Sequence, residues 1–360
     1  MNLMQGMSER ALEQGIPMRV HLDLTYRCNE RCVHCYLDHE DHGEMTTAEI
    51  LDLLDQLAAA GTFFLSISGG EIFMRQDLFQ ILEYARDLRF SVQLKTNAVM
   101  IRAAKAKRLA QLGLDQVQIS LYSHIPETHD AITLLPGSHA RTLEGARLLI
   151  EHGVKVRFAC VLMSHNADDY HGVRALAQTM GAAFSMDATI TPMMDGDRSI
   201  LSLNVNQDRL AEVFRDQSLL GEEAEAMTTA PMAPASKEDA QLSLPCSAGH
   251  TACYVSPYGE VFPCVQFPYL TGNIRKQRFV DIWQHSPQLQ EVRAIRVSDL
   301  EGCSSCIHSS NCTRCPGLAY LEGNMRGPSI QDCEKSYART GVASYNLQKK
   351  KLRTIPMAVL

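Results

Sequence analysis

Between residues 18 and 215, short strand-like segments alternate with longer segments of helical period. The strand-like segments are short apolar runs, at 20–24, 63–68, 92–96, 116–120, 156–162 and 184–188. Six strands that are each followed by a helix are typical of a parallel βα array, so we predict an α/β fold, a partial (β/α)6 TIM-like barrel. In such barrels the functional loops follow the C-terminal ends of the strands, so a motif that directs chemistry should come directly after a strand.

Several helix ends are marked by capping residues. Thr46 and Glu49 have the spacing of a capping box, and the apolar residues that follow recur at helical spacing up to Gly61, which suits the C′ position. Asp77 is placed to cap a second helix that runs to Leu88. Further helices are predicted around 101–112, 142–151 and 168–180.

Composition excludes several classes of protein. Apolar residues make up 45% and charged residues 21%, as in an ordinary globular protein. No run is long and apolar enough to span a membrane, and the first residues lack a secretory signal, so we expect a soluble cytoplasmic protein with no membrane partner. The net charge of −7 argues against binding to nucleic acid.

Composition and cysteine content divide the chain into five parts. We predict an N-terminal extension at 1–17, the barrel at 18–215 and a linker rich in Ala, Pro and Glu at 216–243. A loop-rich segment at 244–345 holds most of the cysteines, and a basic tail follows at 346–360. Because the cysteine-rich segment has little apolar periodicity, we expect metal–sulfur bonds to supply much of its stability.

Eleven of the twelve cysteines fall in two clusters along the sequence. Cys28, Cys32 and Cys35 lie in one loop directly after the first predicted strand, and eight more fall between Cys246 and Cys333. Cys160 stands alone in an apolar strand and is expected to be buried. A reducing compartment disfavours disulfides, so clustered thiols indicate metal or iron–sulfur ligands.

Three thiolates on one loop suit a [4Fe–4S] cluster whose fourth iron has no protein ligand. A structural zinc loop is the alternative, although zinc sites more often pair two separated CxxC knuckles. The segment TYRCNERCVHCY resembles the CxxxCxxC signature of radical S-adenosylmethionine (SAM) enzymes, including the aromatic Tyr36 after the third cysteine. Ser68-Gly69-Gly70-Glu71, after the second strand, resembles the glycine-rich SAM motif of that family.

The resemblance implies roles for individual residues. Cys28, Cys32 and Cys35 would hold the radical-generating cluster, and the backbone at Tyr36 would face the adenine of SAM. The methionine amino end of SAM would be received by Gly69, Gly70 and Glu71, and its ribose and carboxylate by Asn97 and Ser120. Thr133 stands where many relatives have an arginine that clamps the SAM carboxylate, which leaves Arg141 as a substitute candidate.

The C-terminal cysteines resemble the SPASM extension of peptide- and protein-modifying radical SAM enzymes, which carries two auxiliary [4Fe–4S] clusters. By that analogy one cluster would be bound by Cys246, Cys253, Cys264 and Cys315, and the other by Cys303, Cys306, Cys312 and Cys333. A zinc ribbon built from Cys303, Cys306, Cys312 and Cys315 is the alternative.

The two resemblances together imply a maturase of ribosomally synthesised peptides, of the pyrroloquinoline-quinone-maturase-like group. Such an enzyme would use an external one-electron reductant and a 5′-deoxyadenosyl radical to abstract hydrogen from a precursor peptide, leading to a cross-link, epimerisation or backbone excision. With about 17 residues before the first strand, we expect a separate leader-peptide-binding protein.

Three other functions stay open. A sulfatase-activating enzyme would usually carry an aspartate directly after the third SPASM cysteine, where this chain has Val265. A haem- or cofactor-tailoring radical SAM enzyme is the second. The third is an iron–sulfur electron carrier, which the open iron of a three-cysteine cluster disfavours.

Overall fold

The computed structural model describes residues 3–194, 196–216, 242–309, 312–344 and 347. It divides the chain into two compact units. The first unit comprises Met1–Asn204 and Ala248–Val292, and the second comprises Val205–Ser247 and Arg293–Leu360. Most of the predicted linker and of the basic tail lie outside the described residues.

The first unit is built on the predicted parallel sheet. Neighbouring strands follow chain order and pair in parallel: β1 (Arg19–Asp23), β2 (Phe64–Ser68), β3 (Ser91–Thr96), β4 (Gln116–Ser120), β5 (Val156–Val161) and β6 (Ala183–Asp187). The prediction of six parallel strands in an α/β fold is confirmed, with boundaries within one residue of those expected.

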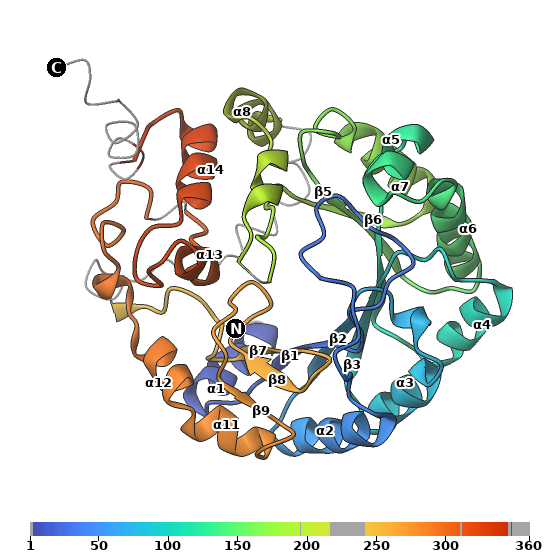
Figure 1. Ribbon diagram of the computed structural model, residues 1–360, viewed down its shortest axis with the longest axis horizontal. Coiled ribbons are helices and arrows are strands. Elements are labelled where there is room, and N and C mark those ends of the chain that lie inside the picture. The colour runs from blue at the N-terminus through green and yellow to red at the C-terminus, as the bar shows by residue number, and fades with distance from the viewer. Residues whose placement is uncertain (1–2, 195, 217–241, 310–311, 345–346, 348–360) are drawn as a thin grey trace. The chain divides into compact units, whose positions relative to one another are not determined.

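Helices cover the outer face of this sheet (Figure 1). They are α2 (Thr47–Ala59), α3 (Leu78–Asp87), α4 (Ala103–Gln111), α5 (Pro126–Thr133), α6 (Ser138–Glu151) and α7 (Tyr170–Met180). The Thr46–Glu49 capping box is present at the start of α2. Asp77 precedes α3 as expected, but its carboxylate binds Arg75 and Thr47 and makes no cap hydrogen bond.

The sheet continues beyond β1 with strands that the sequence analysis did not anticipate. β7 (Ala252–Val255) pairs in parallel with β1, and β8 (Glu260–Phe262) and β9 (Gly272–Asn273) follow in antiparallel order to complete nine strands. Two helices follow these strands, and α1 precedes β1: α11 (Phe279–His285), α12 (Pro287–Ala294) and α1 (Leu3–Glu13). Part of the cysteine-rich segment therefore belongs to the sheet of the first unit.

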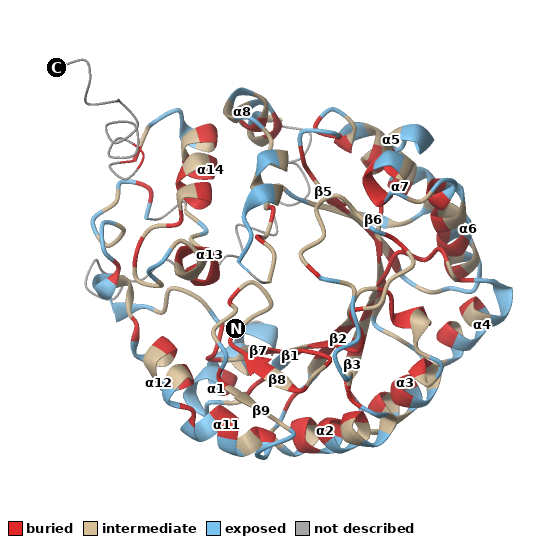
Figure 2. Ribbon diagram, viewed as in Figure 1, coloured by how far each residue is buried: buried red, intermediate tan, exposed pale blue. Residues whose placement is uncertain are grey.

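Side chains of the sheet alternate between an apolar outer face and a polar inner face. In β3 the buried residues are Val92, Leu94 and Thr96, whereas Gln93 and Lys95 are partly exposed on the other face. Figure 2 shows buried positions along the sheet and on the helix faces that turn toward it. A closed TIM barrel fills its interior with branched apolar side chains. The inner face of this sheet is polar instead.

The second unit contains α8 (Gln207–Arg215), α13 (Pro316–Leu321) and α14 (Ile330–Thr340) among its described residues. α8 and α14 pack together, with the Arg339 guanidinium 4.6 Å from the centroid of the Phe214 ring. Most of the described residues between α12 and α13 form turns and irregular structure. None of the helices in the described parts of the chain is both long enough and apolar enough to cross a membrane.

Candidate functional site

A cavity of about 410 Å³ opens at the C-terminal ends of the strands in the first unit. Cys28, Cys32 and Cys35 all line it, on the loop that follows β1. The other residues that the family resemblance selected line the same cavity, with the exception of Glu71: Tyr36, Gly69, Gly70, Asn97 and Ser120. The structure therefore brings residues from the ends of four neighbouring strands together around the three thiols.

The turn that contains the two glycines packs directly on the backbone of the cysteine loop. Gly70 N donates to Thr25 O at 2.8 Å, and Glu71 N donates to Arg27 O at 2.9 Å. A Cβ on Gly69, whose φ is +143°, would lie 2.3 Å from Thr25 O, and one on Gly70 would lie 2.5 Å from Arg27 O. Only glycine permits this approach, so the pair joins the two loops in addition to lining the cavity.

Glu71 lies beneath the cavity and is fully buried. Its carboxylate accepts hydrogen bonds from Thr96 Oγ1 at 2.9 and 2.8 Å, from Asn97 N at 2.8 Å and from Phe73 N at 3.0 Å. Burial raises its pKa, while these donors act in the opposite direction. With its oxygens engaged in this way, Glu71 ties the glycine turn to the end of β3. A contact with the SAM ammonium through this side chain stays a prediction.

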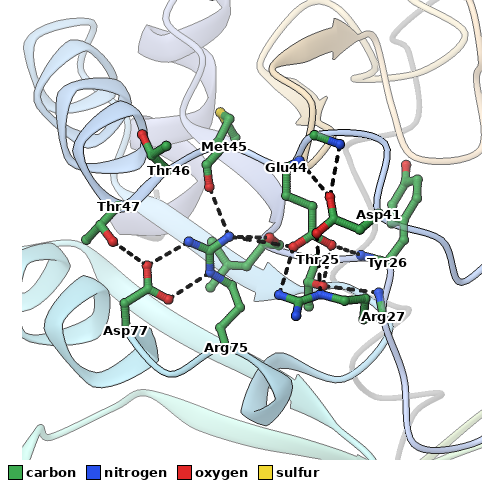
Figure 3. A network of polar contacts seen from close by, with 12 residues as sticks. Thr25, Tyr26, Arg27, Asp41, Glu44, Met45, Thr46, Thr47, Arg75 and Asp77 are labelled. Atoms are coloured by element: carbon green, nitrogen blue, oxygen red, sulfur yellow. Dashed lines mark hydrogen bonds and ion pairs between the residues drawn. The ribbon is translucent and has the colours of Figure 1, made fainter.

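A buried polar network fixes the first residues of the cysteine loop (Figure 3). Glu44 accepts hydrogen bonds from Thr25 Oγ1, from Tyr26 N at 3.0 Å and from Arg27 Nη2 at 3.1 Å. Arg75 donates to the carbonyl oxygens of Leu24 and Met45, both at 3.0 Å, and pairs with Asp77 at 2.6 Å. Because the side chains of Glu44 and Arg75 are only 4% and 7% exposed, their interactions are shielded from water.

The far side of the cysteine loop is held by the end of α5. Arg31 N donates to Thr133 O at 3.1 Å, and Val33 N donates to Ile132 O at 3.0 Å. The Thr133 hydroxyl is buried against Ser138 at 2.7 Å. Arg141 binds the carbonyl oxygens of Gly137 and Pro136, at 2.9 and 2.8 Å, and its guanidinium does not reach the cavity.

The three thiols fit the ligand set of an iron–sulfur cluster. Burial raises the pKa of Cys28 to about 12 and also raises the pKa values of Cys32 and Cys35. A free thiol here is therefore neutral, and metal binding would displace its proton. In the described part of the chain, no three His, Cys, Asp or Glu side chains gather closely enough to hold a single metal ion. A cubane, by contrast, binds each cysteine through a different iron.

A second set of thiols lines a cavity of about 360 Å³ in the second unit. These are the four residues assigned to one auxiliary cluster: Cys303, Cys306, Cys312 and Cys333. Cys333 lies on α14, and burial raises its pKa to about 11. The Cys315 backbone amide instead donates to Asp332 Oδ2 at 2.8 Å. The assignment of these four cysteines to one cluster, and the alternative of a zinc ribbon that includes Cys315, stay predictions.

The cysteines assigned to the other auxiliary cluster divide between the units. Cys253, on β7, and Cys264 line a cavity of about 340 Å³ in the first unit. Cys246 and Cys315 belong to the second unit. Their assignment to one cluster stays a prediction.

Sequence analysis missed the polar residues that form the floor of the 410 Å³ cavity around Cys28, Cys32 and Cys35, which we call the main cavity. His21, Lys95 and Gln118 line it from the inner face of β1, β3 and β4. The sequence did contain a signal, because polar residues occupy every second position of VQLKT and QVQIS. In a strand, alternate positions face the same side, so these residues had to share one face.

Two family models match the chain in the regions that carry these sites. Residues 22–177 match the radical SAM superfamily, and residues 246–316 match the SPASM iron–sulfur cluster-binding domain. The chain therefore carries a radical SAM domain followed by a SPASM domain. A radical SAM domain binds SAM and a [4Fe–4S] cluster, and the SPASM domain binds iron–sulfur clusters, so the cofactor classes implied by the resemblance are confirmed.

Curated relatives match this radical SAM/SPASM chain over most of its length. An AdoMet-dependent heme synthase of Methanosarcina barkeri is 29% identical, over 84% of this chain and 92% of the relative. The mycofactocin maturase MftC of Mycobacterium ulcerans is 28% identical, over 92% of each chain. The subtilosin biosynthesis protein AlbA of Bacillus subtilis is 29% identical, over 86% of this chain and 69% of the relative.

Solved structures share the fold. Streptococcus suis SuiB bound to S-adenosylmethionine superposes with a TM-score of 0.71 at 19% identity, covering 90% of this chain and 80% of SuiB. The structure of anSMEcpe with bound AdoMet gives a TM-score of 0.69 at 16% identity and covers 92% and 100% of the two chains.

Proposed function

We propose that this enzyme modifies a ribosomally synthesised precursor peptide, through a cross-link, an epimerisation or a backbone excision. The observation that supports this proposal best is the pair of cysteine-lined cavities, one in each unit, together with the mycofactocin and subtilosin relatives. One cavity combines three thiols with a glycine turn, as reductive SAM cleavage requires, and the other offers four thiols for an auxiliary cluster.

When bound, the reduced cluster and SAM would supply a 5′-deoxyadenosyl radical that abstracts a hydrogen atom from the substrate. Cys28, Cys32 and Cys35 would hold the cluster, while the glycine turn, Asn97 and Ser120 would orient SAM. Asn97 suits this role because its amide already lies 3.9 Å from Cys28 Sγ and donates to Asn29 Oδ1 at 2.8 Å. The chain itself contributes orientation and the exclusion of water.

Val265 bears on the sulfatase-activating alternative. This side chain lines the main cavity at the position directly after Cys264, where a sulfatase-activating enzyme would usually place an aspartate base. An aliphatic side chain cannot accept a proton, so the composition of this wall favours a substrate class other than sulfatases.

The proposal is tested with anaerobically reconstituted enzyme. We expect about twelve irons, four for each of three clusters, and release of 5′-deoxyadenosine from SAM on reduction. Replacing Cys28, Cys32 and Cys35 together by Ala should abolish that release and leave about eight irons. Surviving 5′-deoxyadenosine production in this variant, or zinc in place of iron at the C-terminal cysteines, would contradict the cluster assignment.

A tailoring reaction on haem or a related cofactor is the second candidate, because the Methanosarcina relative is a heme synthase. Peptides encoded beside the gene and iron porphyrin precursors should be compared as substrates in the same SAM-cleavage assay. Coupled turnover of a porphyrin with none of any peptide would replace the first proposal by the second.

We also propose two partners, a separate leader-peptide-binding protein and an external one-electron reductant. Turnover of the precursor peptide should rise when a leader-binding protein encoded nearby is added. Tight leader binding by the isolated full-length enzyme would instead indicate direct recognition.

A further inference from the structure

Two neighbouring layers of polar side chains on the inner face of the sheet differ in how they are hydrogen-bonded. The deeper layer is satisfied by its own members. Ser66 Oγ donates to Gln93 Oε1 at 3.3 Å, Gln93 Nε2 donates to Gln116 Oε1 at 3.2 Å, and Arg157 Nε donates to the same oxygen at 3.0 Å. This layer therefore forms a connected hydrogen-bond network below the main cavity, and Ser66 and Gln93 also line the cavity that contains Cys253 and Cys264.

The layer above it, formed by Lys95 and Gln118, has no such partners. These residues are directly paired in register on β3 and β4, so their side chains project side by side into the main cavity. Neither makes a hydrogen bond to another described residue. Burial lowers the pKa of Lys95, and the charges of Asp23 and of a Cys264 thiolate counteract that effect. Both side chains are partly exposed to the cavity, so a ligand that enters it can replace water as the hydrogen-bond partner of the ammonium and the amide.

The nearest carboxylate of the protein is already committed elsewhere. Asp23 is fully buried, with Oδ1 3.0 Å from His21 Nε2 and Oδ2 accepting a hydrogen bond from Tyr254 at 2.9 Å. Both oxygens of Asp23 thus have partners other than Lys95. The ammonium faces the cavity as an available donor.

We propose that Lys95 and Gln118 form a subsite for a carboxylate of the substrate. One carboxylate oxygen would accept from the ammonium and the other from the amide, so the two side-by-side donors match the two oxygens. This inference rests on the proposed function and narrows its substrate to a peptide that presents a C-terminal, Asp or Glu carboxylate in the cavity. A terminal phosphate suits the subsite less well, because two donors match the two oxygens of a carboxylate and leave the third oxygen of a phosphate without a partner in this pair.

The position of the subsite separates it from the groups assigned to SAM. Asn97 directly follows β3 and lies beside the Cys28 thiol, whereas Lys95 lies two residues earlier, within β3 and about 7 Å deeper into the sheet. A substrate anchored by its carboxylate at this depth would present the carbons next to that carboxylate toward the SAM end of the cavity. Lys95 and Gln118 would in this way select the site of hydrogen abstraction.

The test measures binding to the reconstituted, SAM-loaded enzyme without reductant. Ligand-observed NMR compares 3-phenylpropionate with its neutral analogue 3-phenylpropionamide. We expect wild-type enzyme to bind the acid about tenfold more tightly than the amide, as a charge-assisted hydrogen bond provides. Lys95→Met should abolish this preference and Lys95→Arg should retain it. Gln118→Glu should also abolish it, because a tethered carboxylate would occupy Lys95.

Lys107→Met is the matched control, since it removes one charge from an exposed position of α4 and should leave the preference intact. Iron content and circular dichroism of each variant establish that it is folded and loaded. A wild-type enzyme without preference for the acid, or a preference that survives Lys95→Met, would overturn the proposal. So would a Lys95→Met variant that loses SAM affinity, which would assign Lys95 to the carboxylate of SAM. None of these binding measurements requires turnover. A negative result can therefore be distinguished from an enzyme that does not release 5′-deoxyadenosine.

Discussion

The two cysteine-lined cavities lie in very different protein environments. In the first unit the thiols sit on a loop that is fastened by the Glu44 network, by the glycine turn and by the end of α5. In the second unit the thiols come largely from turns and irregular segments, with Cys333 alone on a helix of regular length. The first cavity is therefore formed by hydrogen bonds of the protein, whereas the second should depend on its metal for stability.

Removing thiols from each cavity gives the largest expected contrast. Cys333→Ala should lower the stability of the second unit by about 5 kcal/mol or more, because metal binding and folding are coupled there. The Cys28, Cys32 and Cys35 triple Ala variant should cost the first unit only about 2 kcal/mol, since its loop keeps its backbone partners. Amide hydrogen exchange in α14 and in β3 reports the two units separately. Equal loss of protection in both variants would contradict the comparison.

Arg75→Met tests whether side chains rather than metal form the first cavity. This substitution removes two hydrogen bonds to backbone carbonyls and the ion pair with Asp77, and it leaves Arg27 as the remaining cation beside the buried Glu44, which should cost about 3 kcal/mol. Affinity for SAM should fall as the cysteine loop loosens. Arg108→Met is the control, because Arg108 pairs with Glu83 at an exposed site, where a pair contributes less than about 1 kcal/mol. Unchanged SAM affinity in the Arg75 variant would show that the metal alone orders the loop.

Substitution of Arg275, which pairs with Glu49, should have a smaller effect on the free energy of unfolding. Arg275 also donates to Gly43 O at 2.7 Å, so it links the segment after β9 to the segment before α2. Its hydrogen bond lowers the pKa of Glu49 to about 2. Stability from a lowered carboxyl pKa is present above the unfolded-state value and is lost as pH falls through the folded-state value. Arg275→Met should therefore cost about 1 kcal/mol by urea denaturation, equally at pH 6 and at pH 8. A penalty that changes between these pH values would assign the effect to another group.

The alternating strands and helices of the barrel could be predicted because each element is indicated by residues that lie close together in the sequence. Short apolar runs located β1 to β6 within one residue, and the capping box placed the start of α2. The cysteine loop and the glycine turn could be located because each directly follows a strand. β7 escaped prediction because its pairing with β1 joins segments more than two hundred residues apart, and the short run ACYV carries no sign of its partner.

The role of individual site residues was less predictable than their location. Spacing gave no indication that Glu71 would be enclosed by donors from the end of β3, because that depends on how deeply its side chain is buried. Lys95 was not predicted as a site residue because functional residues were expected directly after a strand. That criterion selects Asn97, two residues later. The alternation of polar residues along β3 and β4 was visible in the sequence, but its meaning depends on whether the interior is packed or open.

The pairing of β7 with β1 has a consequence for dissecting this enzyme. β1, which leads into the cysteine loop, is hydrogen-bonded on both sides, by β2 and by β7. A shortened chain that stopped after α8 would keep β1 to β6 but leave β1 as a bare edge strand, with unpaired amides available to a strand of another molecule. Such a fragment should aggregate, and its loss of activity would reflect self-association rather than a requirement for the SPASM clusters in SAM cleavage.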